Sequence, residues 1–330
     1  MILAGDVGGT KCSLGLFRQE EDRLRPVFQS RLATRDYPGF DQLIAAFVKQ
    51  AAAAGIESQA IEAAGFGVAG VVVNGRHLSE NLPWVVDASA LKQSLGLQRV
   101  RLLNDLAATA LSLERLGADD VICLNAGVEA LHTTRAVIAA GTGLGTAILF
   151  WDGGKYRVAA SELGHTDFAP HSEREIRLLS HLRKQFAPVS CEEIASGRGF
   201  RRIHEFLNAE VTHETFETNS GNAASEISQR GLAGTCGVCA ETLDIWAQTF
   251  AAMTGNFALQ TMALAGVYIA GGIAVKILPK LRERAFFDAF CGDGKLAGVL
   301  KGVPLSVVVN EDAPMLGAAY EALMRQGAAI

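Results

Sequence analysis

Short apolar runs, glycine turns and amphipathic stretches alternate along most of the chain. An apolar run over residues 2–6, a glycine turn at 7–10 and a second apolar run over 12–17 predict two strands joined by a tight turn. Apolar residues then recur at helical spacing over 41–54. The first third predicts strands at 2–6, 12–17, about 27–28, 62–68 and 100–103, and helices at 41–54, 88–95 and 106–116.

The rest of the chain repeats this order. A second glycine turn at 141–143 lies between apolar runs, about 135 residues after the first turn. This part predicts strands at 121–124, 136–140, 146–150 and 305–309, and a last helix at 315–324. Two strand–turn–strand units at this separation indicate an α/β protein in which one arrangement of elements is used twice.

One segment is apolar enough to imitate a membrane span. Residues 245–275 contain no charged side chain, and a bilayer needs about 20 such residues. Polar residues recur within it at helical spacing, however, and Gly266, Gly271 and Gly272 interrupt it. We therefore expect a long buried helix followed by a central strand of a sheet, and no membrane partner.

Two other segments bear on the organisation of the chain. Residues 116–120 read as the end of a helix before a new strand, which favours a domain boundary there. The polar, turn-rich stretch between Glu210 and Arg230 predicts a surface excursion within the second domain. The last helix follows Asp312-Ala313-Pro314 and is expected to return to the first domain.

The composition and net charge of the chain exclude several classes of protein and partner. Of the 330 residues, 49% are hydrophobic and 20% charged, which excludes a disordered chain. A net charge of −5 argues against nucleic acid and anionic membranes, because neutralising phosphates requires clustered Lys and Arg. The six cysteines are scattered, as is usual for reduced thiols, and no basic leader precedes Asp6, so we expect a cytoplasmic protein.

The first glycine turn, Gly5-Asp6-Val7-Gly8-Gly9-Thr10-Lys11, combines a carboxylate at a strand end with residues that lack a Cβ. Backbone amides and the Thr10 hydroxyl there can approach a phosphate closely, although a plain hairpin turn would use the same residues. The turn lacks the P-loop pattern and no helix is predicted after it. Similar turns occur at Ala140-Gly141-Thr142-Gly143 and at Ala270-Gly271-Gly272.

In this order the three turns resemble the phosphate-1, phosphate-2 and adenosine elements of the actin, hexokinase and heat-shock ATPase superfamily. Within it, three further segments resemble the proteobacterial-type bacterial glucokinases: Leu103-Asn104-Asp105, Glu162-Leu163-Gly164-His165-Thr166-Asp167-Phe168-Ala169-Pro170 and Cys191-Glu192-Glu193-Ile194-Ala195-Ser196-Gly197. The resemblance runs from Ile2 to about Leu323, and it is specific because these motifs occur together at these separations.

The resemblance implies a two-domain α/β fold of the ribonuclease H-like, actin/hexokinase ATPase type with an interdomain cleft. A smaller domain would span 1–115 plus 313–330 and a larger one 116–312. The implied reaction moves the γ-phosphoryl group of ATP to the 6-hydroxyl of glucose and gives glucose 6-phosphate for glycolysis. Mg²⁺ would bridge the phosphates and be held by Asp6 through water.

The resemblance also implies roles for individual residues. Asp105 would be the catalytic base, and the sugar would be bound by Asn104, Glu162, His165 and Glu192. The nucleotide would be bound by Gly5, Asp6, Val7, Gly8, Gly9, Thr10, Lys11, Gly141, Thr142, Gly271 and Gly272. Lys11 stands where related glucokinases often have Asn, so it is either a phosphate ligand or a solvated strand residue.

Several alternatives stay open. Asn104-Asp105 is also a typical N-cap pair, and Glu162 with His165 is half of a possible zinc site. Cys236-Gly-Val-Cys239 is interpreted as structural thiols, because a single Cys-x-x-Cys without a second pair is half of a metal site. ROK-type sugar kinases have a cluster of zinc-binding cysteines soon after the His of Glu-x-Gly-His, whereas the next cysteine after His165 in this chain is Cys191. Other functions on the same fold are a kinase for another hexose or amino sugar, a sugar sensor and a filament-forming ATPase. Glucose and ATP are the expected partners, together with a second copy of the chain in a homodimer.

Overall fold

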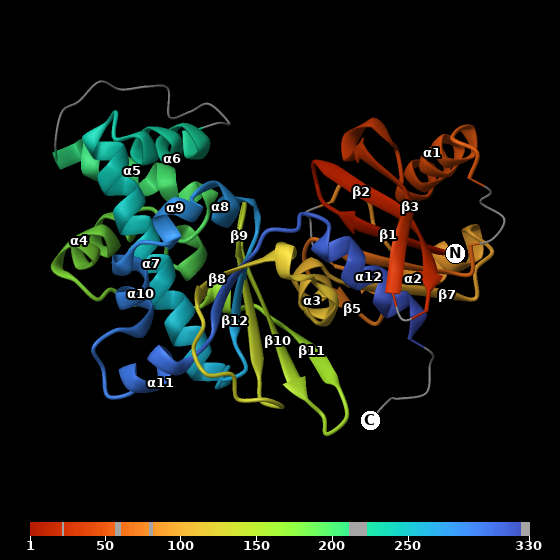
Figure 1. Cartoon of the computed structure of the whole chain (residues 1–330). Helices are drawn as coiled ribbons and strands as arrows, with labels where there is room; N and C mark the ends of the chain where they lie inside the picture. The colour runs from red at the N-terminus through yellow and green to blue at the C-terminus, as the bar shows by residue number, and fades with distance from the viewer. Residues whose placement is uncertain (22, 57–60, 79–81, 211–222, 325–330) are drawn as a thin grey trace. The chain divides into compact units, whose positions relative to one another are not determined.

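The computed structural model describes residues 1–330 except 22, 57–60, 79–81, 211–222 and 325–330, and the chain divides into two compact units (Figure 1). Unit 1 comprises Met1–Asp120 and Asn310–Ile330, and unit 2 comprises Val121–Val309. Each unit contains one mixed β-sheet with its own helices and its own hydrophobic core.

The sheet of unit 1 has the strand order β3-β2-β1-β4-β7. An antiparallel meander forms one side of the sheet, and two parallel strands extend it on the other. The strands are β1 (Ile2–Val7), β2 (Lys11–Glu20), β3 (Arg23–Ala33), β4 (Ala63–Val68) and β7 (Arg99–Asn104), and a separate short ribbon pairs β5 (Val72–Val73) with β6 (Arg76–His77).

Helices cover both faces of this sheet because β1 is apolar on both sides. Leu3 faces a core with α1 (Phe40–Ala53) and α2 (Ala88–Ser94). Ile2 and Ala4, at alternate positions, face the C-terminal helix α12 (Ala313–Leu323), which packs beside α3 (Asp105–Ser112). Side chains of a strand alternate between faces, so this apolar strand is buried on both.

The sheet of unit 2 has the order β11-β10-β9-β12-β13-β8, which repeats the arrangement of unit 1. Its strands are β8 (Val121–Asn125), β9 (Arg135–Ala140), β10 (Leu144–Trp151), β11 (Tyr156–Ser161), β12 (Val267–Ala270) and β13 (Leu305–Val308). The meander β9-β10-β11 is antiparallel, and β12 and β13 follow β9 in parallel. The predicted repeated arrangement is therefore confirmed.

The long uncharged segment lies inside unit 2. It belongs to α7 (Gly237–Thr261), whose Trp246, Phe250 and Phe257 are fully buried, and it continues into β12 in the interior of the sheet. In the described part of the chain, the helices are all too short or too polar to cross a membrane. The remaining helices are α4 (Glu173–Leu182), α5 (Gly197–Glu210), α6 (Ala223–Ala233), α8 (Gly272–Lys276), α9 (Leu278–Leu281), α10 (Arg284–Cys291) and α11 (Ala297–Gly302).

Four expectations about elements need correction. The helix predicted over 106–116 ends at Ser112 and continues as a 3₁₀ turn. The excursion predicted between Glu210 and Arg230 is wrong for Ala223–Arg230, which lie in α6 and pack on α7, while 211–222 lie outside the described residues. The third strand, β3, is much longer than predicted, and the strand β11 was not predicted. Both are edge strands that form by pairing, β3 with β2 and β11 with β10, and their local apolar pattern is weak.

Candidate active site

The first glycine turn joins β1 to β2 as a tight hairpin. The Gly8 amide donates to the Lys11 carbonyl at 3.1 Å, and the buried Thr34 hydroxyl donates to the Gly8 carbonyl at 2.6 Å. Gly5 and Val7 are buried within β1, which pairs with β2 on one side and β4 on the other. As predicted, a strand and not a helix follows the turn, which leaves turn amides and the exposed Thr10 to meet a phosphate.

Asp6 is a partly buried carboxylate at the end of β1, between β2 and β4. Its pKa is raised to about 6, mainly by burial; Lys11 and Arg31 oppose this rise, and Asp312 adds to it. Arg31 also forms an ion pair with Asp312 at 3.8 Å. Asp6 and the nearby Asp312 offer carboxylate oxygens that suit a hard cation, and Mg²⁺ commonly uses one or two protein carboxylates together with phosphates.

The raised pKa of Asp6 predicts how the free energy of unfolding depends on pH. An acid whose pKa is higher in the folded than in the unfolded state destabilises the fold when ionised; this cost is complete above about pH 6 and disappears below its ordinary value of 3.8. Asp6→Asn is therefore expected to be more stable than the parent to urea at pH 8, by up to about 3 kcal/mol, and nearly equal to it at pH 4. Unfolding curves in EDTA at both pH values measure this, with Asp293→Asn at an exposed position as control. An unchanged difference between the two pH values would show that Asp6 is not desolvated.

Asn104 and Asp105 lie where β7 ends and α3 begins. The Asn104 side-chain oxygen accepts from the amides of Leu106 at 2.9 Å and Ala107 at 3.1 Å, and its amide nitrogen donates to the Gly70 carbonyl at 3.0 Å. Asn104 is thus the helix N-cap, as the alternative interpretation held. Asp105 is partly buried, and its Oδ1 accepts from the Leu106 amide at 2.9 Å, which fixes the carboxylate at the helix start.

Parallel pairing brings these groups of unit 1 to one edge of the sheet. Val7 is in register with Val68, and Val68 with Asn104. Neighbouring strands lie about 4.8 Å apart, so the first glycine turn and the start of α3 are separated by about 10 Å. In open α/β sheets ligands bind at the carboxyl ends of the strands, which is where Asp6 and Asp105 lie.

The two glycine turns of unit 2 are also neighbours. The turn at 141–143 follows β9 and is closed by the Gly141 amide, which donates to the Gly143 carbonyl at 2.9 Å. The adenosine-like turn follows β12, the parallel neighbour of β9. Gly271 has a φ of +91°, and a Cβ there would lie 2.6 Å from the Ala140 carbonyl oxygen. The close approach of the two turns therefore requires glycine at 271.

Unit 2 also brings together three of the four predicted sugar ligands. Glu162 and His165 lie on a 3₁₀ turn after β11, with 3.8 Å between Glu162 Oε2 and His165 Nε2, and both are exposed. Glu192 lies on a second 3₁₀ turn, Cys191–Glu193. The Cys191 amide donates to the Thr166 carbonyl at 2.8 Å and joins the two turns.

Glu192 differs from the other two because it is mostly covered. Its side chain is 15% exposed, its Oε2 accepts from the Leu144 amide at 3.0 Å, and its Oε1 accepts from Arg198 at 2.6 Å. Leu144 directly follows the glycine turn at 141–143. The sugar-ligand candidate is therefore in direct contact with the phosphate-2-like turn, which the sequence did not predict.

The Cys-x-x-Cys pair serves as the start of α7. Cys236 is the N-cap residue, and its sulfur accepts from the Cys239 amide at 3.4 Å. Burial and the neighbouring Cys236 raise the pKa of Cys239 to about 12, which keeps this thiol protonated at neutral pH. Within the described ranges, no three His, Cys, Asp or Glu side chains are grouped so that they could hold a metal ion.

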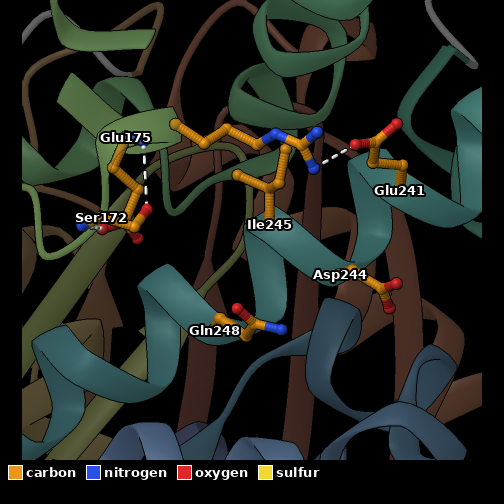
Figure 2. A pocket seen from close by; sticks show the side chains of 7 residues that line it. Ser172, Glu175, Glu241, Asp244, Ile245 and Gln248 are labelled. Carbon is orange, nitrogen blue, oxygen red and sulfur yellow. Dashed lines mark hydrogen bonds and ion pairs between the residues drawn. The ribbon is translucent and has the colours of Figure 1, made fainter. Parts of the chain in front are cut away.

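One hollow on unit 2 is separate from all of these residues. It has a volume of about 520 Å³ and lies between the start of α4 and α7 (Figure 2). Ser172 and Glu175 form a capping box at its edge, and Arg174 pairs with Glu241 across it. A second cavity of about 190 Å³ borders the sugar-ligand segment through Leu163, Thr166 and Cys191 but contains none of the predicted ligands.

Two charged residues near the predicted site had no signal in the sequence. Asp312 influences Asp6 from the start of α12, and Arg198 contacts Glu192 from the first turn of α5. Asp312 lies at the opposite end of the chain from Asp6, and Arg198 directly follows the motif at 191–197 without belonging to it, so neither residue was identified from the motifs.

Comparison with known proteins gives consistent matches over nearly the whole chain. The family model described as glucokinase matches residues 3–325. A glucokinase of Trichormus variabilis is 33% identical over 339 aligned positions, covering 97% of this chain and 98% of the relative. The crystal structure of a glucokinase from an Antarctic psychrotroph has a TM-score of 0.84 at 26% identity, covering 97% of this chain and 98% of that one. A ROK family glucokinase from Streptomyces griseus, solved in complex with glucose and AMPPNP, shares the fold with a TM-score of 0.65 at 24% identity, over 99% of both chains.

Proposed function

Because the chain belongs to the glucokinase family, we propose that it transfers the γ-phosphoryl group of ATP to the 6-hydroxyl of glucose. The products are ADP and glucose 6-phosphate. The observation that supports the proposal is the contact of Glu192 with the Leu144 amide, because a predicted sugar ligand is then a direct neighbour of the phosphate-2-like turn. A kinase needs both kinds of group at one place.

Unit 1 supplies the base in this proposal. Asp105 accepts the proton of the 6-hydroxyl as the hydroxyl oxygen attacks the γ-phosphorus and the bond from that phosphorus to the bridging oxygen of ADP breaks. The start of α3 holds the carboxylate in a fixed position, supported by the Asn104 cap. Asn104 has both polar atoms of its side chain engaged, so it binds sugar only through the second hydrogen of its amide nitrogen.

The glycine turns bind the nucleotide. The phosphates are bound by Gly8, Gly9, Thr10 and Lys11 of unit 1 and by Gly141 and Thr142 of unit 2. The adenosine packs against the backbone of Gly271 and Gly272, which have no side chain. Asp6 would hold Mg²⁺ through water, with Asp312 adding negative charge nearby. When bound, Mg²⁺ neutralises phosphate charge. The reduced cysteines support a cytoplasmic location, and a homodimer remains part of the proposal.

The predicted sugar ligands of unit 2 indicate how different sugars would be discriminated. Glu162, His165 and Glu192 accept or share hydrogen bonds from hydroxyls, and an analogue that leaves one of them unpaired loses about 1–3 kcal/mol, or about 5- to 150-fold. A coupled assay of ADP release over glucose, mannose, glucosamine, galactose and sorbitol is expected to give the highest kcat/KM for glucose. The reaction should require ATP and a divalent cation.

Other outcomes of the same assay identify the alternatives. Highest activity with an amino sugar or another hexose would reassign the substrate within the family. If galactose or sorbitol were as good as glucose, the sugar-ligand assignment would be abandoned. Glucose binding by calorimetry without ADP release would indicate a sugar sensor.

A further inference from the structure

Arg198 lies on the second residue of α5 and contacts the mostly covered Glu192. The guanidinium donates to Glu192 Oε1 at 2.6 Å, and the Arg198 side chain is 53% exposed whereas that of Glu192 is 15% exposed. The arginine therefore covers one oxygen of the carboxylate from the solvent side. A charge-assisted bond of this length restricts the orientation of the carboxylate.

The other oxygen of Glu192 faces the phosphate-2-like turn. Glu192 Oε2 accepts from the Leu144 amide at 3.0 Å, and a Cβ at position 143 would collide with this same oxygen. Gly197, next to Arg198, donates its amide to the Gly141 carbonyl at 2.8 Å. The segment from Glu192 to Arg198 thus contacts the turn at both of its ends, so a shift of the carboxylate also shifts the turn.

We propose that Arg198 is a positioning residue that acts through Glu192. Arg198 fixes the orientation of the Glu192 carboxylate. This carboxylate then contacts the phosphate-2-like turn and also binds the sugar, so the position of the sugar depends on the position of the turn. This inference rests on the proposed kinase function and deepens it. Arg198 itself touches neither substrate in this scheme.

The rest of α5 supplies a matched control. Arg201 lies one turn further along the same helix, is 46% exposed and pairs with Glu205 at 2.6 Å. Its ion pair has the same length as that of Arg198 and the two arginines are similarly exposed, but Glu205 is 37% exposed and makes no described contact with the turn. Arg201→Gln therefore removes an equivalent ion pair without affecting Glu192.

A double-mutant cycle tests the proposal. In the parent background, Arg198→Gln is expected to raise KM for glucose and lower kcat, with a loss of about tenfold or more in kcat/KM. In the Glu192→Gln background, the same change should have little further effect, because the group through which Arg198 acts is already altered. Arg198→Lys should recover part of the loss, and Arg201→Gln should leave kcat/KM within about twofold.

Each contrary result has a distinct meaning. If Arg198→Gln costs as much in the Glu192→Gln background as in the parent, Arg198 acts directly, for example on a phosphate, and the proposal is wrong. It is equally wrong if Arg198→Gln behaves like Arg201→Gln. If the parent protein releases no ADP with any sugar, the proposed function fails, and glucose affinity by calorimetry over the same four-protein cycle still decides whether Arg198 acts through Glu192.

Discussion

Replacing Asp105 by alanine is expected to lower kcat by roughly 10²–10⁴-fold, the usual contribution of a positioned general base. The carboxylate lies at the end of β7 in the same sheet edge as Asp6, and the Leu106 amide holds its Oδ1 at 2.9 Å. Steady-state rates of ADP release measure the loss. Glucose binding, followed by calorimetry, should persist because the sugar-ligand cluster lies in unit 2.

Asp105→Asn is the matched variant for this experiment. Asparagine keeps an oxygen that can accept from the Leu106 amide, so it preserves the helix start while removing the base. Both variants should therefore lose kcat to a similar degree, whereas any loss of melting temperature should be confined to alanine. Activity of Asp105→Asn within a few-fold of the parent would remove Asp105 from the mechanism.

Gly164→Ala is expected to reduce kcat/KM for glucose by about 10- to 100-fold. A Cβ at position 164 would collide with the backbone oxygen of Leu144, and backbone cannot move aside as a flexible side chain can. The 3₁₀ turn that carries Glu162 and His165 must therefore shift away from β10. A misplacement of about 1 Å in a substrate-positioning group commonly costs this much.

The control for this substitution is Gly294→Ala. Gly294 has open space around the position of a Cβ and no left-handed φ, so alanine there should change neither glucose kinetics nor stability. If Gly164→Ala retains the glucose kcat/KM of the parent while lowering the melting temperature, the glycine serves packing alone and the turn does not position the sugar ligands.

The candidate site could be predicted in part from sequence. The three glycine turns were placed correctly between their elements, because turn chemistry and strand periodicity depend on residues that are close in the chain. The residues of the recognised motifs were assigned roles through the resemblance to bacterial glucokinases, and membership of the glucokinase family is confirmed. The roles of individual residues remain predictions for the experiments above.

Local pattern could not show how the motifs meet. The N-cap function of Asn104 was visible from its place between a strand and a helix, but its bond to Gly70 depends on the neighbouring strand β4 and the loop after it. Similarly, Gly164 in the sequence is only a spacer between Glu162 and His165. In the structure it is the point where their turn touches Leu144.

The sequence by itself determined that this is an α/β protein with a repeated strand–turn–strand unit, and that its glycine turns can approach a phosphate closely. Periodicity and turn chemistry are local properties of the chain. Only the tertiary structure decided the edge strands β3 and β11, the contact of Glu192 with both Leu144 and Arg198, and the influence of Asp312 on Asp6. The contact of Glu192 with Leu144 and the influence of Asp312 on Asp6 join residues that are distant in the chain, so no short window of sequence contains both partners. The edge strands and the Glu192–Arg198 pair join residues that are closer in the chain, but the pattern of apolar and polar residues does not specify which strands pair or which side chains meet.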